Sequence, residues 1–308
     1  MFLKLKRYIK NPYYAFGDDI IKTHPEWMTD RYFIKVFWRQ MMSFPLDLRH
    51  PITFNEKLQW MKLYDRNPVY TELVDKLKVK KWVSERIGPE YVIPTLAVYN
   101  SVEDIDLAVL PDRFVLKCNH DSGGVIICTD KDSFDLNRAK EVLKQRLEHD
   151  FYRDYREWPY KNVERKVFAE AFIEDPFTQK NDHSFPGLTD YKFFCFDGTP
   201  RIMYIANDRG ESPTTDFFDM DYHHLPIQMK DPPSTVPPTR PRNFERMKEL
   251  ASVLSHGFRQ VRVDFYDTGE HVYFGEMTFF HSAGFSEVHP YEWNVKMGNW
   301  IPIEGPSR

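Results

Sequence analysis

The sequence predicts a mixed α/β (α+β) fold in which two α+β lobes follow a helical N-terminal region. Helical periodicity dominates residues 1 to about 90, and from about residue 91 short β-rich runs alternate with helical stretches. The chain has 308 residues, more than the roughly 250–300 at which a single hydrophobic core stops growing. We therefore expect three parts, at 1–90, 91–175 and 176–308.

Helix signals in the N-terminal region are clear. Thr53 is followed three residues later by Glu56, which is the spacing of a capping box, and apolar residues recur at helical intervals from Leu58 onward. This pattern predicts a helix that begins after Thr53. A second helix is expected over 75–87, because Gly88 and the proline after it stop a helix.

The middle part alternates strands and helices. Two β-rich runs, 113–118 and 125–128, flank the glycine-containing loop 120–124, which predicts a strand, a loop and a second strand. We expect a helix over 136–151 and a further strand over 166–173.

Hairpins characterise the C-terminal part. The dipeptide Asp197-Gly198 is a strong turn signal between strands expected at 191–196 and 201–206. A second turn, 267–269, separates strands expected at 260–266 and 271–277. Between the hairpins we expect a strand at 215–221, an exposed proline-rich loop at 226–242 and a helix at 244–258.

The composition excludes several classes of protein. The chain is 42% hydrophobic and 29% charged, which is ordinary for a globular enzyme and unlike a disordered or fibrous chain. A net charge of −4 gives no electrostatic reason to expect a nucleic-acid partner. Three cysteines without C-x-x-C spacing argue against a disulfide framework or a zinc site and fit the reducing cytoplasm.

The N-terminus allows two interpretations. No apolar run approaches the roughly 18 residues of a membrane span. Within residues 2–10, however, four cations alternate with apolar side chains. Such a stretch is either a solvated first helix, which is the commoner case, or an element that rests on an anionic membrane surface. We expect a cytoplasmic protein, with peripheral contact to the inner membrane surface as the alternative.

Two acidic residues near the C-terminus suggest a metal site. Asp264 lies in one strand of the second predicted hairpin and Glu276 ends the other, so antiparallel pairing would bring both carboxylates to one face. Mg²⁺ is usually held by one or two carboxylates together with substrate phosphates. Arg262 is two residues before Asp264 and points to the same face of a regular strand. The alternative is an exposed strand face with an ordinary salt bridge.

Three lysines are candidates for phosphate binding. Lys117 ends an apolar strand directly before the loop 120–124, whose backbone amides can cradle a phosphate. Lys192 opens another apolar strand, whereas Lys76 stands in a lysine-rich segment that is typical of a solvated helix face. Neither a P-loop nor a Rossmann fingerprint is present.

Taken in order, these segments resemble the ATP-grasp ligases. The family's nucleotide-binding lysines are similar to Lys76 in Asp75-Lys76-Leu77 and Lys117 in 114–117, and its adenine-binding hinge strand to 168–173. Its closing metal motif is similar to Arg262-Val263-Asp264 and Glu276-Met277-Thr278. Three further segments resemble the teichuronopeptide-biosynthesis (TupA-like) branch: 53–66 (TFNEKLQWMKLYDR), 190–194 (DYKFF) and 217–221 (FFDMD).

This resemblance implies that two lobes clasp ATP, with a lid lobe at 91–175 and a Mg²⁺-carrying lobe at 176–308. It implies catalytic roles for Arg262 and Lys192 and metal binding by Asp264, Glu276 and Thr278, although the family commonly has asparagine where Thr278 stands. It implies nucleotide binding by the following residues: Lys76, Lys117, Ser122, Gly123, Gly124, Glu170, Phe172, Ile173 and Lys192.

The resemblance also implies an activity. Members of this branch are thought to attach amino acids to uronic acids of capsular or cell-surface polysaccharides, so the expected partners are an amino acid or other amine and a uronic-acid-containing glycan or its precursor. Two alternatives stay open. Asp219-Met220-Asp221 has the D-x-D form found in many glycosyltransferases, and a non-catalytic assembly protein could keep the same fold.

Overall fold

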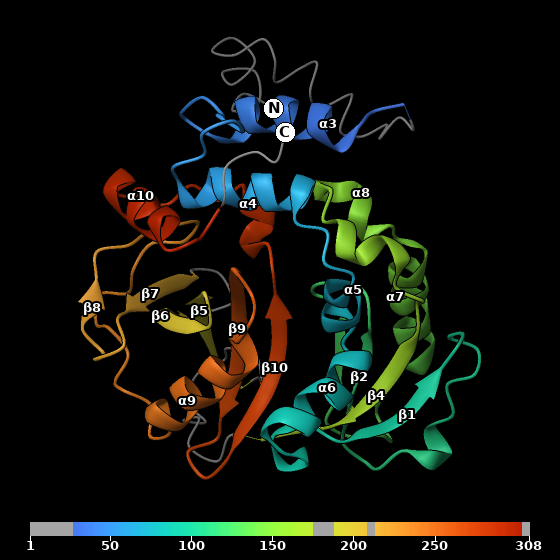
Figure 1. The fold of residues 1–308 in the computed structure, drawn as a ribbon. Coiled ribbons are helices and arrows are strands. Elements are labelled where there is room, and N and C mark those ends of the chain that lie inside the picture. Colours follow the sequence, from blue (N-terminus) through green and yellow to red (C-terminus); the bar gives the residue numbers. More distant parts are fainter. Residues whose placement is uncertain (1–26, 175–187, 208–212, 304–308) are drawn as a thin grey trace.

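The computed structural model describes residues 27–174, 188–207 and 213–303. Two antiparallel sheets form two lobes, and helices α3 (Asp30–Met41) and α4 (Phe54–Tyr64) lie across the top of both (Figure 1). The basic amphipathic stretch at 2–10 lies outside the described residues, so its interpretation stays a prediction. In the part of the chain that the structure describes, no helix has the length and apolar character required to cross a membrane.

The smaller lobe is built on a four-stranded sheet in the order β1-β4-β2-β3. Helix α7 (Leu136–Glu148) buries Ala139 and Leu143, and its Leu143 shares a hydrophobic core with this sheet. Short elements α8 (Phe151–Tyr155) and η3 (Trp158–Asn162) follow α7. The strands are β1 (Thr95–Tyr99), β2 (Phe114–Cys118), β3 (Val125–Cys128) and β4 (Val167–Ala171).

The larger lobe contains a six-stranded sheet in the order β10-β9-β5-β6-β7-β8. Helix α9 (Phe244–Ser255) packs on it with its apolar face, and α10 (Tyr291–Asn299) lies against α4. The strands are β5 (Asp190–Phe196), β6 (Thr199–Asn207), β7 (Thr214–Phe218), β8 (His224–Leu225), β9 (Gln260–Asp267) and β10 (Val272–Thr278).

Three of the N-terminal helices belong to the larger core, whereas α3 packs in a separate cluster with Ala283 and Phe285. Helix α4 (Phe54–Tyr64) begins with the expected capping box, in which Thr53 and Glu56 satisfy each other's backbone N–H groups. Phe54 and Leu58 of α4 are part of the same hydrophobic cluster as the six-stranded sheet. The remaining helices here are α3 (Asp30–Met41), α5 (Val69–Val74), α6 (Lys78–Ile87) and η1 (Pro89–Tyr91). The division of the chain at 90 and 175 stays a prediction.

Most predicted elements are confirmed, and several predicted boundaries are wrong. The helix expected at 244–258 ends at Ser255. The expected helix 75–87 begins only at Lys78, because the Asp75 carboxylate accepts the N–H groups of Leu77 and Lys78. The expected helix 136–151 ends at Glu148, and a separate short helix follows. The strand expected at 215–221 ends at Phe218, so the D-x-D residues lie in the turn after it.

Candidate functional site

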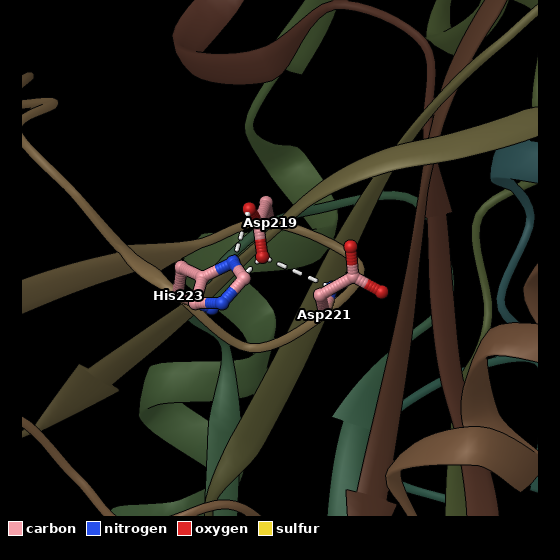
Figure 2. Close-up of side chains that lie close together, drawn as sticks. All are labelled: Asp219, Asp221 and His223. Atoms are coloured by element: carbon pink, nitrogen blue, oxygen red, sulfur yellow. Dashed lines mark hydrogen bonds and ion pairs between the residues drawn. The ribbon is translucent and has the colours of Figure 1, made fainter.

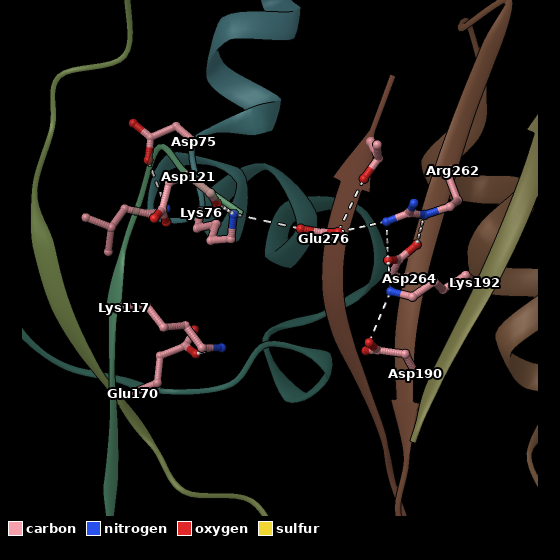
Figure 3. Close-up of polar contacts among 12 residues, drawn as sticks. Asp75, Lys76, Lys117, Asp121, Glu170, Asp190, Lys192, Arg262, Asp264 and Glu276 are labelled. Atoms are coloured by element: carbon pink, nitrogen blue, oxygen red, sulfur yellow. Dashed lines mark hydrogen bonds and ion pairs between the residues drawn. The ribbon is translucent and has the colours of Figure 1, made fainter. Parts of the chain in front are cut away.

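A cavity of about 260 Å³ lies between the two sheets. One wall comes from β2, β4 and the segment around Lys76, and the other from β5, β9 and β10 (Figure 3). Charged side chains occupy both walls. Eight residues predicted from the sequence line this cavity: Lys76, Lys117, Ser122, Gly123, Glu170, Lys192, Asp264 and Glu276.

The two acids face each other across the hairpin of β9 and β10. Asp264 pairs in register with Glu276, which confirms the predicted hairpin. Arg262 joins them. Its Nε and Nη2 donate to Oδ1 and Oδ2 of Asp264, both at 2.7 Å, and Nη2 also donates to Oε1 of Glu276 at 2.8 Å. Such a bidentate pairing fixes the carboxylate and the guanidinium in one plane.

Lys192 supplies a second cation to the same acids. It lies on β5 in register with Asp264, and its Nζ is 2.6 Å from Oδ2 of Asp264. The same Nζ is 3.1 Å from Oδ2 of Asp190, a cavity residue that sequence reasoning missed. The signal was present, because Asp190 is two residues before Lys192 and therefore on the same face of the strand.

These contacts keep the site charged. Burial alone would raise the pKa of Glu276, but Lys76, Arg262 and Lys192 outweigh it and hold that pKa at about 2. Burial alone would lower the pKa of Lys192, but Asp264 raises it above its ordinary value. Glu276 and Lys192 are therefore both ionised at neutral pH, and this wall of the cavity carries charges of both signs.

The opposite wall is formed by two lysines that share one carboxylate. Lys117 Nζ lies 2.6 Å from Oε2 of Glu170, and Lys80 Nζ lies 2.6 Å from its Oε1. Burial alone would raise the pKa of Glu170, but Lys117 and Lys80 lower it. Lys80 was not predicted, because its helix carries several lysines and its partner lies far away in sequence. Its spacing of four residues from Lys76 was the available signal.

Lys76 connects the two walls. Its Nζ donates to the backbone carbonyl of Asp121 in the loop 120–124 and lies 3.8 Å from Oε2 of Glu276. In Figure 3 the Glu276 carboxylate lies between Lys76 on one side and Arg262 on the other. A ligand that enters the cavity would therefore meet Lys76, Lys80 and Lys117 together with the paired acids.

The loop 120–124 has its own geometric requirements. Gly123 adopts a φ of +87°, where side chains are strained, and a Cβ there would meet nothing within 4 Å. A Cβ on Gly124 would lie 2.5 Å from Oδ2 of Asp121, so this glycine allows a close approach. Gly124 is buried beneath the loop, whereas Ser122 and Gly123 are exposed and line the cavity.

The D-x-D residues form a small exposed cluster elsewhere. Asp219, Asp221 and His223 each bring one potential ligand atom within 4.8 Å of the others (Figure 2). The Asp219 carboxylate, however, accepts the backbone N–H groups of Asp221 and His223 and bonds the ring of His223 at 3.0 Å. An aspartate that accepts backbone N–H groups from the residues just after it commonly stabilises a turn, so these contacts have a structural explanation. Within the described residues, the cavity lining does not include this cluster.

Comparison with known proteins identifies the family. Residues 56–302 match the model of a family described as TupA-like ATP-grasp. The chain belongs to this family. The match contains all the cavity residues named above and confirms the ATP-grasp fold expected from the order of the sequence motifs.

Several solved structures are similar in fold. D-alanine–D-alanine ligase from Bacillus anthracis is 18% identical, with 67% of this chain and 56% of that chain covered and a TM-score of 0.40. L-amino acid ligase from Bacillus licheniformis is 12% identical, with coverages of 82% and 58% and a TM-score of 0.45. The chain thus spans little more than half the length of these ligases. No curated protein matches the sequence.

The residues present fit the metal that an ATP-grasp protein requires. Asp264 and Glu276 offer hard carboxylate oxygens on one cavity wall, and each carboxylate has lone pairs beyond those used by Arg262 and Lys192. Thr278 is less suited. Its hydroxyl donates to Oε1 of Glu276 at 3.4 Å, so it lies beside the acid, and its role as a ligand stays a proposal.

Two predicted nucleotide residues lie beyond the end of a strand. Strand β4 ends at Ala171, two residues earlier than expected, and the Phe172 ring lies 4.1 Å from the guanidinium carbon of Arg113. Among the described residues that line the cavity, Phe172 and Ile173 do not occur. That the backbone groups of Phe172 and Ile173 pair with the edge of adenine therefore stays a proposal.

Proposed function

We propose that this protein is an ATP- and Mg²⁺-dependent ligase that joins a carboxylate to an amine through an acyl phosphate. One observation carries the proposal. A single cavity holds Lys76, Lys80 and Lys117 on one side and the acid pair Asp264–Glu276 on the other. Cations that neutralise phosphates and carboxylates that bind Mg²⁺ are the two requirements of phosphoryl transfer. Membership of the TupA-like ATP-grasp family supports the same activity.

The chain's own residues would contribute as follows. Lys76, Lys80 and Lys117 would neutralise the phosphates, and Mg²⁺ bound at Asp264 and Glu276 would offset the charge that develops during transfer. A substrate carboxylate oxygen then bonds to the γ-phosphorus as ADP leaves. The amine nitrogen bonds to the acyl carbon, phosphate departs with the C–O electron pair, and the amine proton passes to water. Arg262 does not line the cavity but bonds both acids that do, and we propose that its charge would stabilise the oxyanion of that tetrahedral intermediate.

We further propose that the carboxylate belongs to a uronic acid of a capsular or cell-surface glycan or its precursor, and that the amine is an amino acid. The support is the resemblance of three segments, 53–66, 190–194 and 217–221, to the teichuronopeptide branch, together with the family match. A cytoplasmic location follows from the need for ATP, and contact with the inner membrane surface stays part of this proposal.

The experiment is a phosphate-release assay with Mg-ATP across a panel of amino acids and uronic-acid glycans. We expect release that requires one member of each panel, with an amide in the product. Asp264→Asn should abolish phosphate release, because the variant lacks the negative charge proposed to bind Mg²⁺. The same carboxylate also pairs with Arg262 and Lys192, so the substitution disturbs both cations. Consumption of a nucleotide sugar without ATP would instead favour a glycosyltransferase. Absence of Mg-ATP binding would favour the assembly protein.

A further inference from the structure

Helix α4 presents a buried polar stripe that the proposed chemistry does not use. Asn55, Gln59 and Lys62 lie four and three residues apart, so they share one helix face, and all three are almost completely buried. Polar groups in such a position are costly unless they are hydrogen-bonded. Their side-chain nitrogens all donate to backbone carbonyls, which indicates that the stripe holds other segments of chain in place, while the amide oxygens of Asn55 and Gln59 are buried without a partner among the described residues.

That segment follows the metal-bearing strand β10. Asn55 Nδ2 donates to the carbonyls of Gly284 and Ser286 at 3.2 and 2.8 Å, and Gln59 Nε2 donates to Ala283 at 3.1 Å. Lys62 Nζ donates to the same Ala283 oxygen at 2.8 Å. One carbonyl thus receives two donors from one helix.

The held segment, η4 (His281–Gly284), is strained. Ser282 and Ala283 have left-handed φ values of 48° and 52°, and Gly284 has a φ of 71°. Each non-glycine residue in this region costs on the order of 1 kcal/mol or more and persists only when its surroundings enforce it. A Cβ on Gly284 would lie 2.6 Å from Nε2 of Gln59, so the fit to α4 leaves no room for a side chain. The stripe bonds the carbonyls of this segment directly and therefore contributes to holding its conformation.

The strained segment places a histidine against the proposed catalytic arginine. His281 Nδ1 lies 2.8 Å from Nη1 of Arg262, and because arginine only donates, the ring nitrogen accepts. Burial first, and then the charges of Arg262 and Lys192, keep the pKa of His281 well below its ordinary value, so the ring is neutral. The remaining guanidinium nitrogens bind Asp264 and Glu276. His281 therefore completes the orientation of Arg262.

Lys62 also contacts a second segment of the chain, the end of helix α8. Its Nζ donates to the Tyr155 carbonyl at the end of α8 at 2.9 Å, so one amino group joins α8 to the segment after β10. In Figure 1, α4 runs across the top of both lobes and ends beside α8. The charged groups that face Lys62 are Glu157 and Asp30, and the Phe285 ring lies 4.3 Å from its Nζ. An apolar residue would fill this place at a lower cost of burial.

We propose that Lys62 is a positioning residue: by joining the carbonyl oxygens of Tyr155 and Ala283 it fixes the segment 281–284 and, through His281, the guanidinium of Arg262. The proposal rests on the role proposed for Arg262 in ligation, but its first test does not require turnover. Lys62 touches neither the cavity nor the acids, so its effect on the site passes through the backbone of the strained segment.

The test is ¹⁵N NMR of the full chain labelled at histidine, with the His281 signal assigned by its loss in His281→Asn. The wild type should show an unprotonated, hydrogen-bonded Nδ1 and a protonated Nε2. We expect Lys62→Met to shift both nitrogens toward the values of a mixture of tautomers. The matched control is Lys57→Met, which removes another α4 lysine–carbonyl bond, to Ile301 at 2.8 Å, and should leave the His281 signal unchanged.

A wild-type His281 signal in Lys62→Met would overturn the proposal. If that variant does not fold, Lys62→Gln serves in its place, since it keeps an amide donor but is too short to join both carbonyls; an unchanged signal there has the same meaning. When ligation substrates are known, Lys62→Met should lower kcat by roughly 10- to 100-fold, with KM for ATP within about two-fold. A wild type that releases no phosphate would contradict the proposed function while leaving the NMR result intact.

Discussion

At the scale of single residues, Arg262 is the most heavily bonded group of the site. It binds both oxygens of Asp264, one oxygen of Glu276 and the ring of His281, and it is buried. Burial would lower its pKa, but Asp264 raises it well above the ordinary value, so its charge is permanent. A permanent, immobile cation is suited to stabilise an oxyanion that exists only in the transition state, because no reorganisation is needed when that charge develops.

We expect Arg262→Ala to lose ligation while nucleotide binding stays near normal. Removal of one preorganised donor typically costs about 2.7–4 kcal/mol in the transition state, which corresponds to a loss of roughly 10²–10³ in kcat. The measurements are phosphate release under saturating substrates and the Kd for Mg-ATP by calorimetry. Turnover within a few-fold of wild type would show that Arg262 has no such role.

At the scale of elements, local signals in the sequence were sufficient to predict structures whose contacts lie close together in the chain, such as hairpins and helix caps. The turns at Asp197-Gly198 and 267–269 predicted both hairpins, and the capping box predicted the start of α4. Lys62 belongs to the same α4 motif, yet its contacts were hidden because its partners Tyr155 and Ala283 lie 93 and 221 residues away. Lys80 was missed for the same reason, since only the fold brings it to Glu170.

The loop 120–124 allows a controlled test of its part in nucleotide binding. Gly123 and Gly257 have φ values of +87° and +86°, and an added Cβ meets nothing within 4 Å at either position. Alanine should therefore destabilise the fold equally at both, by roughly 1 kcal/mol. Only Gly123 lines the cavity, so only Gly123→Ala should weaken Mg-ATP binding, by about five- to ten-fold. Equal affinities in the two variants would argue against a phosphate-binding loop.

At the scale of the whole molecule, the cavity is the place where the two sheets approach each other, and charged contacts cross it. Lys76, which is bonded to the loop of the smaller lobe, faces Glu276 of the larger lobe at 3.8 Å. On the larger-lobe side, Arg262 and Lys192 already compensate the acids. A polyphosphate with its metal would add charge-assisted contacts to both walls at once, and would therefore stabilise the lobes together.

We accordingly expect Mg-ATP to raise the melting temperature of the whole chain in one cooperative transition. At a ligand concentration of about 100 times Kd, the added stability is about 2.7 kcal/mol, or a shift of roughly 4 °C for a chain of 308 residues. ATP with EDTA should give a much smaller shift, because without Mg²⁺ the phosphates lose their link to Asp264 and Glu276. Asp264→Asn should remove most of the difference between the two conditions. Differential scanning calorimetry measures both. Equal shifts with and without Mg²⁺ in the wild type would mean that Asp264 and Glu276 do not hold the metal, and the cavity would then bind nucleotide through its lysines alone.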